Sequence, residues 1–360
     1  MELSVDPDIT VAQTLPVEFY LQKDLYNLSK DKLFASTWQF IGDEDQVKDP
    51  GWITPITFLE NFIDEPLILT KDKESAIQCL TNVCTHRGNL IIDKPCKLMD
   101  LRCKYHGRRF HLNGKFLSMP EFKEVKNFPT EADDLTSLPL FKWVKWLFTS
   151  LNQSQPPEVF FKEMIERVKW MPFKKFNFRP DLSKDYVVNA HWALYCENYL
   201  EGFHIPFIHA GLNSVIDYGN YAIELFKYSS LQIGIAREGE LTFELPSSSP
   251  DYGKDVASYY FWVFPNMMFN FYPWGLSINL IHPVGISKTK VKFLCYVWDE
   301  SKLRQGAGAN LHQVELEDEE VVQNVQKGIR SRFYNFGRYS VTRETGTHHF
   351  HRLICEFMNR

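Results

Sequence analysis

The sequence predicts an α+β protein in which a small all-β domain precedes a larger domain of helices around an antiparallel sheet. Short apolar segments separated by turn signals run from Trp38 to about Phe148. A second series, rich in aromatic and β-branched residues, runs from Asn220 to Asp299. Helical patterns precede and follow that second series. The order of these patterns places the two domains one after the other along the chain.

The first two segments of the chain differ in their periodicity. Residues 1–37 form a predicted N-terminal helical segment that packs on the larger domain, and five apolar residues recur there near helical spacing: Phe19, Leu21, Leu25, Leu28 and Leu33. Residues 38–150 form the predicted all-β domain. Its clearest hairpin signal is Asn113-Gly114 between two strand-like pairs.

Residues 151–360 form the predicted larger domain. Ser150–Pro157 is rich in Ser, Gln and Pro and is typical of a linker. Helices are expected over residues 158–170, over about 190–204, and over roughly 311–334 as a long helix near the C-terminus. Together with the strands of residues 220–299, these helices give a sheet with helices before and after it.

Composition excludes several classes of function. The chain has 360 residues and a formal net charge of −5, which argues against nucleic acid as a partner. Its start, Met1–Asp6, lacks the apolar core of a secretory signal, and no run of about twenty apolar residues predicts a membrane span. The seven cysteines are an odd number without a paired framework. We therefore expect a cytoplasmic protein that binds no membrane.

Two short motifs carry the strongest chemical signal. Cys84-Thr-His86 and Cys103-Lys-Tyr-His106 are separated by sixteen residues. Zinc modules usually pair like with like, as Cys-x-x-Cys and His-x-x-x-His. Here each motif supplies one thiolate and one imidazole, which suits a [2Fe–2S] cluster whose irons take two Cys and two His ligands, the Rieske arrangement. A structural zinc site is the alternative.

A second set of ligand types follows in the larger domain. Glu201 and His204 are three residues apart, so we expect them to share a helix face. Pro206 is expected to end that helix near His204 and to leave His209 on a turn. Two imidazoles and one carboxylate form the facial triad of non-haem Fe(II) oxygenases. Spacing leaves the carboxylate open among the acidic residues that begin the last long helix: Glu315, Glu317, Asp318, Glu319 and Glu320.

The chain resembles the catalytic (α) component of Rieske non-haem iron oxygenases over nearly its whole length. The flanks His86-Arg87-Gly88 and Tyr105-His106-Gly107 are similar to the two cluster loops of Rieske domains. More narrowly, the chain resembles the choline and carnitine monooxygenase branch in residues 197–204, 325–332, 337–340 and 348–352. The resemblance implies a helix-grip (START-like) catalytic domain after the Rieske domain, and it commonly goes with a homotrimer.

The resemblance also implies roles for single residues. Cys84 and Cys103 would hold one iron of the cluster, and His86 and His106 the other. The mononuclear iron would be held by His204, His209 and Asp318, which is selected because it lies eight residues before Gln326. Two further roles follow from the resemblance: Glu201 would bridge to a cluster His of a neighbouring subunit, and Asn198 would lie near the iron.

The implied function is O₂-dependent oxidation of a small quaternary ammonium compound such as choline, betaine or carnitine, by hydroxylation, N-demethylation or C–N cleavage. Aromatic faces hold such cations. The candidates, each more often a core residue than a cage residue, are Tyr199, Phe203, Phe207, Phe261, Phe264, Phe271, Tyr272 and Trp274. One departure from the family is Arg108 where Trp is usual, which we expect to alter the surface near the cluster.

The chain lacks a dinucleotide-binding or flavin fingerprint after a strand. We therefore expect a separate flavin and iron–sulfur reductase to deliver electrons from NAD(P)H. Two alternatives share part of the pattern. An aromatic-ring hydroxylating dioxygenase α subunit has the same metal ligands, and a non-catalytic Rieske electron carrier would have the cluster without the second iron.

Overall fold

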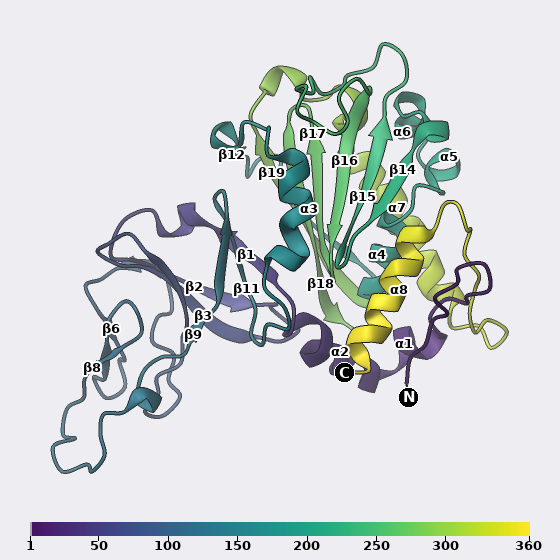
Figure 1. The fold of residues 1–360 in the computed structure, drawn as a ribbon. Coiled ribbons are helices and arrows are strands. Elements are labelled where there is room, and N and C mark those ends of the chain that lie inside the picture. The colour runs from purple at the N-terminus through teal and green to yellow at the C-terminus, as the bar shows by residue number, and fades with distance from the viewer. Residues whose placement is uncertain (1) are drawn as a thin grey trace. The chain divides into compact units, whose positions relative to one another are not determined.

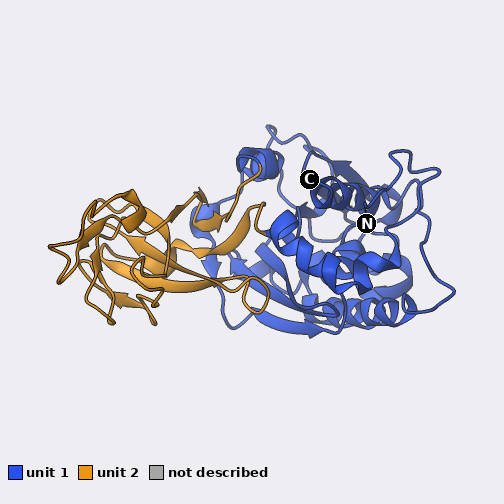
Figure 2. Cartoon of the chain, turned by 90° about the horizontal axis from the view of Figure 1, so that it is seen from below, with its two compact units in different colours: residues 1–34, 155–360 blue, residues 35–154 orange. Residues whose placement is uncertain are grey.

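The structure, a computed structural model, describes residues 2–360 in two compact units. Figure 2 distinguishes them as residues 35–154 and residues 1–34 with 155–360. The α+β class expected from the sequence is confirmed, because one unit is nearly all strand and the other combines helices with a large antiparallel sheet. Within the described residues, no helix is both long and apolar enough to cross a membrane.

The unit of residues 35–154 consists of three small antiparallel sheets with strand orders β1-β11-β10, β5-β2-β3-β4-β9 and β6-β7-β8. Its strands are β1 (Gln39–Asp43), β2 (Trp52–Phe58), β3 (Glu65–Lys71), β4 (Ile77–Thr81), β5 (Cys96–Lys97), β6 (Leu101–Arg102), β7 (Arg109–Phe110), β8 (Phe116–Ser118), β9 (Ser137–Leu138), β10 (Leu140–Trp143) and β11 (Trp146–Thr149). Short 3₁₀ turns are η2 (Glu44–Val47) and η3 (Glu131–Asp133).

The hydrophobic core of this unit reaches the two cysteines of the cluster motifs. Ile68, Leu80 and Phe110 are fully buried, and Cys84 and Cys103 belong to the same group of packed side chains. The expected hairpin is present, because β7 pairs with β8 around Gly114, whose φ is +85°. The loops that carry the thiols are therefore anchored in a packed interior.

The larger unit holds one sheet with the strand order β12-β19-β18-β17-β16-β15-β14, and β13 also pairs with β19. Its strands are β12 (Asn177–Phe178), β13 (Lys184–Val188), β14 (Ala222–Leu225), β15 (Ser229–Ile235), β16 (Val256–Val263), β17 (Met267–Tyr272), β18 (Gly275–Gly285) and β19 (Lys288–Val297). Its helices are α1 (Val17–Leu21), α2 (Lys23–Ser29), α3 (Glu158–Val168), α4 (Trp192–Tyr199), α5 (Ile205–Ile208), α6 (Ala210–Val215), α7 (Leu311–Gly328) and α8 (Thr345–Met358). A π-helical turn and four 3₁₀ turns complete it: η1 (Lys30–Phe34), η4 (Phe173–Lys175), η5 (Tyr218–Asn220), η6 (Glu300–Lys302) and η7 (Gly306–Gly308).

The two faces of this sheet are covered by different helices. Side chains alternate along a strand, so Phe269 faces α3, where its ring lies 6.5 Å from that of Phe161. The neighbouring Asn270 faces the other way and accepts a hydrogen bond from the hydroxyl of Tyr199 in α4 at 2.7 Å. Figure 1 shows α3 in front of the sheet, with α4 and α7 behind it. The face beneath α4 and α7 carries the polar residues.

The chain around His204 differs from the expected single helix. The helix α4 ends at Tyr199, and the carboxylate of Glu201 accepts hydrogen bonds from the backbone N–H groups of Phe203 and His204 in the turn that follows. Pro206 lies in the first turn of α5, where no backbone N–H is needed. The predicted helix does not reach His204, and Glu201 and His204 do not share a helix face. Both predictions are wrong because the carboxylate of Glu201 binds backbone N–H groups and so stabilises a turn after α4.

The C-terminal region also differs from expectation. The predicted long helix ends early, at Gly328, and a second helix, α8, follows at Thr345–Met358. Sequence reasoning missed α8 because its buried face contains His348 and His351 among apolar residues, which breaks the apolar stripe.

His191 fixes the start of α4. Its ring Nδ1 accepts a hydrogen bond from the backbone N–H of Ala193 at 3.3 Å, and the backbone N–H of His191 donates to Oε1 of Gln326 in α7 at 2.6 Å. Rings of Phe19 and Tyr20 pack against the imidazole at 5.3 and 5.5 Å. Burial lowers the pKa of His191 to about 3. The neutral form is therefore a structural requirement, because a protonated ring cannot accept the capping bond.

The folded protein should lose stability as the pH falls below about 6.5, the value for an unfolded histidine. The pKa of His191 is lower in the folded than in the unfolded protein. The contribution of its neutral ring to the free energy of unfolding is therefore complete above about pH 6.5 and is lost as the pH falls towards 3. At pH 5.5 the loss should be about 1.4 kcal/mol. The variant His191→Asn keeps a capping group but does not titrate, so urea unfolding at pH 7.5 and 5.5 should show a smaller drop for it. Equal drops would contradict this role.

Candidate metal centres

The two cluster loops are built in the same way. In each, the cysteine is buried and the histidine is half-buried. The N–H of Gly88 donates to the carbonyl of Cys84, and the N–H of Gly107 donates to that of Cys103, both at 3.0 Å. Both glycines have positive φ, at +70° and +77°, a conformation that suits glycine. The loops thus present thiols inward and imidazoles towards the surface.

The surroundings of these side chains act in different directions. Partial burial, the neighbouring imidazole of His106 and the guanidinium of Arg108 lower the pKa of His86, which favours its neutral form. Burial raises the pKa of the Cys84 thiol. Backbone N–H groups outweigh burial and lower the pKa of the Cys103 thiol, and Asn89 also donates to its Sγ at 3.6 Å. The rings of His86 and His106 lie 4.7 Å apart between their centroids. Two facing loops with paired thiols and paired imidazoles fit a [2Fe–2S] cluster.

Arg108 does not alter the surface near the cluster, contrary to expectation. Its side chain is buried at 2% exposure, and it pairs with Asp133 at 2.5 Å. The guanidinium also lies over the rings of Phe116 and Phe128, at 5.1 and 5.5 Å from their centroids. Asp133 accepts from the backbone N–H of Thr130 as part of a capping box. A buried arginine is tolerated here because a preformed carboxylate and aromatic faces receive it.

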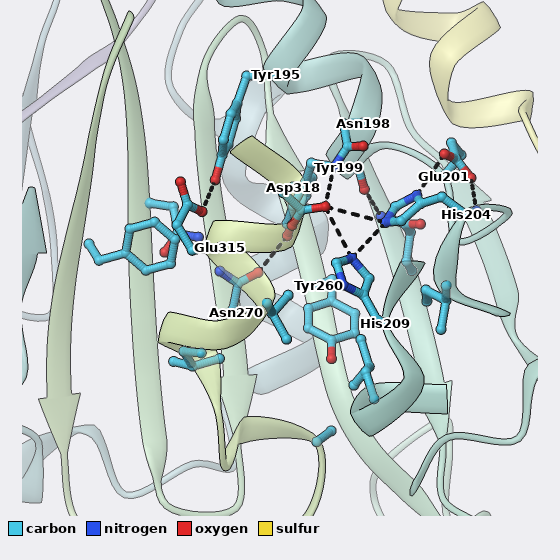
Figure 3. Close-up of a pocket in the computed structure, with 18 of the residues that line it drawn as sticks. Tyr195, Asn198, Tyr199, Glu201, His204, His209, Tyr260, Asn270, Glu315 and Asp318 are labelled. Atoms are coloured by element: carbon cyan, nitrogen blue, oxygen red, sulfur yellow. Dashed lines mark hydrogen bonds and ion pairs between the residues drawn. The ribbon is translucent and has the colours of Figure 1, made fainter. Parts of the chain in front are cut away.

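The second centre joins three residues that are far apart in the sequence. The Nε2 atoms of His204 and His209 lie 3.1 Å apart, and Oδ1 of Asp318 lies 3.7 Å from the first and 3.0 Å from the second. Figure 3 shows the three side chains pointing toward one another. Two ligands about 2.1 Å from one metal and at right angles to it lie about 3.0 Å apart. The triangle therefore has the size of one face of a metal's coordination shell.

The surroundings of the two imidazoles fix which nitrogen faces the metal. Nδ1 of His204 lies 2.7 Å from Oε1 of Glu201, and Nδ1 of His209 lies 2.7 Å from Oε2 of Glu317. In the neutral form of each ring, Nδ1 therefore carries the proton and Nε2 keeps its lone pair. Against the effect of burial, hydrogen bonds with Asp318 and Glu317 raise the pKa of His209, so this place favours positive charge. The donor set fits the facial triad of a mononuclear iron.

The acidic residues at the start of α7 point in different directions and contact different partners. Asp318 faces the two imidazoles and accepts from Nδ2 of Asn198 at 2.6 Å, so the structure brings Asn198 next to the triad. Glu317 holds His209, and Gln313 donates to its other oxygen at 2.9 Å. Sequence reasoning gave no role to Glu317, and only its adjacency to Asp318 could have marked it. Glu315 faces a cavity and accepts from the hydroxyl of Tyr195.

A cavity of about 100 Å³ lies beside the triad, and Asn198, Glu201, His204, His209 and Asp318 are part of its wall. Its aromatic lining consists of Tyr195, Tyr199, Tyr221, Tyr260, Tyr272 and Phe293. Of the eight aromatic candidates named from the sequence, Tyr199 and Tyr272 reach this wall. The other six do not: Phe203 and Phe207 are exposed, whereas Phe261, Phe264, Phe271 and Trp274 are buried elsewhere. Side chains alternate along a strand, so Tyr272 faces the cavity whereas its neighbour Phe271 faces away. In the same way Tyr260, which was not among the candidates, faces the cavity in place of Phe261.

Two family models match this chain. The Rieske [2Fe-2S] domain matches residues 37–129, and the ring hydroxylating alpha subunit (catalytic domain) matches residues 176–360. The chain belongs to the ring hydroxylating alpha subunit family of Rieske oxygenases, as its resemblance implied. These two domains imply a [2Fe–2S] cluster and a mononuclear iron, in agreement with the two sets of side chains.

Similar proteins and structures extend over almost the whole chain. It is 27% identical to a chloroplastic choline monooxygenase of Arabidopsis thaliana, over 97% of this chain and 84% of that protein. It is 23% identical to the carnitine monooxygenase oxygenase subunit of Escherichia coli K12, over 96% and 94%. A solved quaternary ammonium Rieske monooxygenase matches with a TM-score of 0.79 at 21% identity, over 99% and 100% of the two chains. Naphthalene 1,2-dioxygenase from Rhodococcus has the same fold, with a TM-score of 0.74 at 16% identity, over 96% and 94%.

Removing Asp133 should destabilise the unit of residues 35–154. The variant Asp133→Ala leaves a buried guanidinium without its carboxylate, at a cost on the order of 3 kcal/mol. The matched control is Asp93→Ala, which breaks the exposed pair with Lys104 and should cost about 0.5 kcal/mol or less. Urea unfolding followed by the visible absorption of the cluster measures both. Equal losses would contradict a structural role for the Arg108–Asp133 pair.

Removing the carboxylate behind His209 should weaken iron binding without affecting the cluster. The variant Glu317→Ala frees the ring to rotate, and loss of such a partner typically lowers metal affinity about 10–100-fold. The control Glu320→Ala changes an exposed residue of the same helix and should retain iron like the wild type. Iron per chain after dialysis against graded chelator gives the affinity, and the visible absorption reports the cluster independently. Unchanged affinity in Glu317→Ala would exclude this role.

Proposed function

We propose that this chain is the oxygenase component of a two-component monooxygenase that oxidises a small quaternary ammonium compound. The observation that carries the proposal is the ring of tyrosines around the cavity at the triad. Tyr260 lies edge-on to Tyr199 and to Tyr272, with centroids 6.5 and 5.9 Å away. A trimethylammonium group has no hydrogen-bond donor, so aromatic faces are what hold it.

The size of the cavity also favours a small head group. A cavity of roughly 150 Å³ holds one benzene molecule, and this cavity measures about 100 Å³. A trimethylammonium group fits that space better than a fused-ring arene does. The similar choline and carnitine monooxygenases, by their names, act on compounds that carry such a group. These two arguments are independent, since one concerns volume and the other concerns sequence similarity.

We propose the following ligands. Cys84 and Cys103 hold one iron of the cluster, and His86 and His106 hold the other. The mononuclear iron is held by His204, His209 and Asp318. When bound, the cluster supplies single electrons and the iron supplies oxygen activation, which together allow oxidation of a C–H bond next to nitrogen.

The remaining side chains position these ligands and the substrate. Glu201 and Glu317 hold the imidazoles in the tautomer that presents Nε2. Asn198 orients the carboxylate of Asp318 by its hydrogen bond. The tyrosines keep a substrate methyl group beside the triad and exclude water from it. Burial raises the pKa of Tyr199 well above its usual range, so this ring stays neutral in the cavity.

We propose that Glu201 also links this centre to the cluster of a neighbouring subunit in a homotrimer. Its carboxylate accepts from His204 and from the turn that follows α4, which leaves acceptor capacity on an ion with about four lone-pair sites. Phe203 and Phe207, 40% and 77% exposed, lie in the same segment and offer apolar surface for a contact. Inter-subunit electron transfer is described for a similar quaternary ammonium monooxygenase.

We propose that the electrons come from NAD(P)H through a separate flavin and iron–sulfur reductase, because the sequence lacks a dinucleotide fingerprint of its own. None of the seven cysteines, all of which lie among the described residues, forms a disulfide, and this supports a reducing, cytoplasmic location. We propose that residues 38–150 are the Rieske domain and 151–360 the catalytic domain, with residues 1–37 packed on the latter. The compact units, 35–154 and 1–34 with 155–360, support this division, although they place residues 35–37 and 151–154 with the Rieske domain.

Oxygen uptake with NADH and a Rieske-oxygenase reductase should be stimulated by quaternary ammonium compounds. Choline, glycine betaine, carnitine and γ-butyrobetaine form one set of substrates, and naphthalene and benzoate form the other. Formaldehyde release would report attack on an N-methyl group. Uptake with arenes alone would instead favour the aromatic-ring dioxygenase alternative.

An iron count separates the oxygenase from a non-catalytic carrier. Anaerobically purified protein should hold about three irons per chain, two in the cluster and one in the triad. The variant His204→Ala should hold about two and keep its cluster spectrum. Equal counts in both proteins would identify a carrier.

A further inference from the structure

Glu315 is a buried acidic residue in the wall of the cavity. It lies on α7 one turn before Asp318, and its side chain is 2% exposed. Oε2 accepts a hydrogen bond from the hydroxyl of Tyr195, as Figure 3 shows. Oε1 is buried and has no hydrogen-bond partner among the described residues. Buried polar atoms are rarely left in this state, so the free oxygen needs an explanation.

The electrostatic surroundings of Glu315 specify its missing partner. Burial, together with the negative charges of Asp318 and Glu319, raises the pKa of Glu315 well above its usual range, against the hydrogen bond from Tyr195. A carboxylate in such a place is costly unless a positive charge joins it. An organic cation in the cavity would supply that charge at the one oxygen that remains free.

The rest of the wall has no cationic side chain that could pair with an anion. Its ionisable members besides the tyrosines are Glu201, His204, His209, Glu315 and Asp318, and no Lys or Arg is among the described residues that line it. Both imidazoles face the triad and are held there by Glu201 and Glu317. A substrate carboxylate in this cavity would therefore meet acidic side chains and no basic partner, which disfavours such a substrate.

Neutral polar groups are present instead. The side-chain amides of Gln232, Asn270 and Asn279 line the cavity. Asn270 accepts from the hydroxyl of Tyr199 at 2.7 Å, and Asn279 accepts from Oγ of Ser277 at 2.9 Å. Amide groups both donate and accept hydrogen bonds, so they suit a hydroxyl group on the tail of a cation.

We propose that Glu315 is the counter-ion of the substrate and that the cavity selects an organic cation with an uncharged tail. Choline is of this kind, whereas carnitine, γ-butyrobetaine and glycine betaine are zwitterions with a carboxylate. The inference rests on the proposed function, which it narrows from quaternary ammonium compounds in general to those without an anionic group. Glu315 acts on specificity and takes no part in holding the metal.

Direct binding to the intact iron-loaded protein tests the proposal without turnover. Calorimetric titration under anaerobic conditions compares choline with carnitine and with 3,3-dimethyl-1-butanol, which has the shape of choline but no charge. Choline should bind at least about 30-fold more tightly than either, the effect expected for a buried charge pair. This comparison uses the wild type, so it holds whether or not any variant folds.

A pair of variants then assigns the effect to Glu315. Glu315→Gln keeps the shape of the side chain and removes its charge, and it should bring the affinities for choline and 3,3-dimethyl-1-butanol to within about threefold of each other. Glu320→Gln removes the same charge from an exposed position on α7 and should leave the wild-type preference unchanged. Iron content and cluster absorption, measured on both variants, show that the metal sites are intact.

Each outcome distinguishes this inference from the proposed function. Carnitine binding as tightly as choline overturns the inference and leaves a quaternary ammonium function standing. A wild-type preference for choline that persists in Glu315→Gln also overturns the role of Glu315. Binding of naphthalene with no binding of any ammonium compound overturns the proposed function itself.

Discussion

The packing of α4 against α7 is the contact on which the catalytic unit depends. Three hydrogen bonds join the two segments: His191 donates to Gln326, Tyr195 to Glu315 and Asn198 to Asp318. Each bond has a different consequence. The first fixes the start of α4, the second places a carboxylate in the cavity, and the third orients the carboxylate of Asp318. Since His204 and His209 lie in the turn and the short helix that follow α4, a shift of either helix would separate them from Asp318.

The acidic residues of α7 show how helix geometry distributes chemistry. Residues three apart on a helix share a face, so Glu315 and Asp318 both point to the cavity side. Asp318 meets the imidazoles, and Glu315 meets Tyr195 beside the aromatic wall. Glu317 reaches the far side of His209, while Glu320 faces solvent. One acidic run therefore supplies the proposed metal ligand Asp318, the hydrogen-bond partner of His209 and the buried carboxylate that we propose as the counter-ion of a substrate.

The unit of residues 35–154 contains a buried charge of the opposite sign, with different partners. There the buried charge is the cation of Arg108, and it is balanced internally by Asp133 and by aromatic rings. In the catalytic unit the carboxylate of Glu315 has no cationic partner among the described residues, and its Oε1 accepts no hydrogen bond there. Arg108 also keeps one buried nitrogen, Nε, without a hydrogen-bond partner, so the two sites differ in charge balance and not in the count of satisfied atoms. A buried charge with an opposite charge beside it is part of the fold, whereas one without it can bind a charged ligand.

The sequence by itself determined the α+β class, and it predicted the four proposed cluster ligands and the two imidazoles of the proposed triad. Cys84-x-His86 and Cys103-x-x-His106 are local motifs whose ligand types and order carry their own chemistry. The strands could be predicted because short segments of apolar residues lie between turn signals. The choice of Asp318 among its neighbours needed a family resemblance, since five acidic residues in six positions look alike in one dimension.

Only the tertiary structure decided which side chains point where. It ended α4 at Tyr199, because the carboxylate of Glu201 binds the next turn, and it buried Arg108, because Asp133 was in place to receive it. In the tertiary structure Tyr260, and not its neighbour Phe261, lines the cavity. Oε1 of Glu315 has no hydrogen-bond partner among the described residues. These side-chain directions depend on contacts with residues that are distant in the sequence. A local pattern of residues does not specify such contacts.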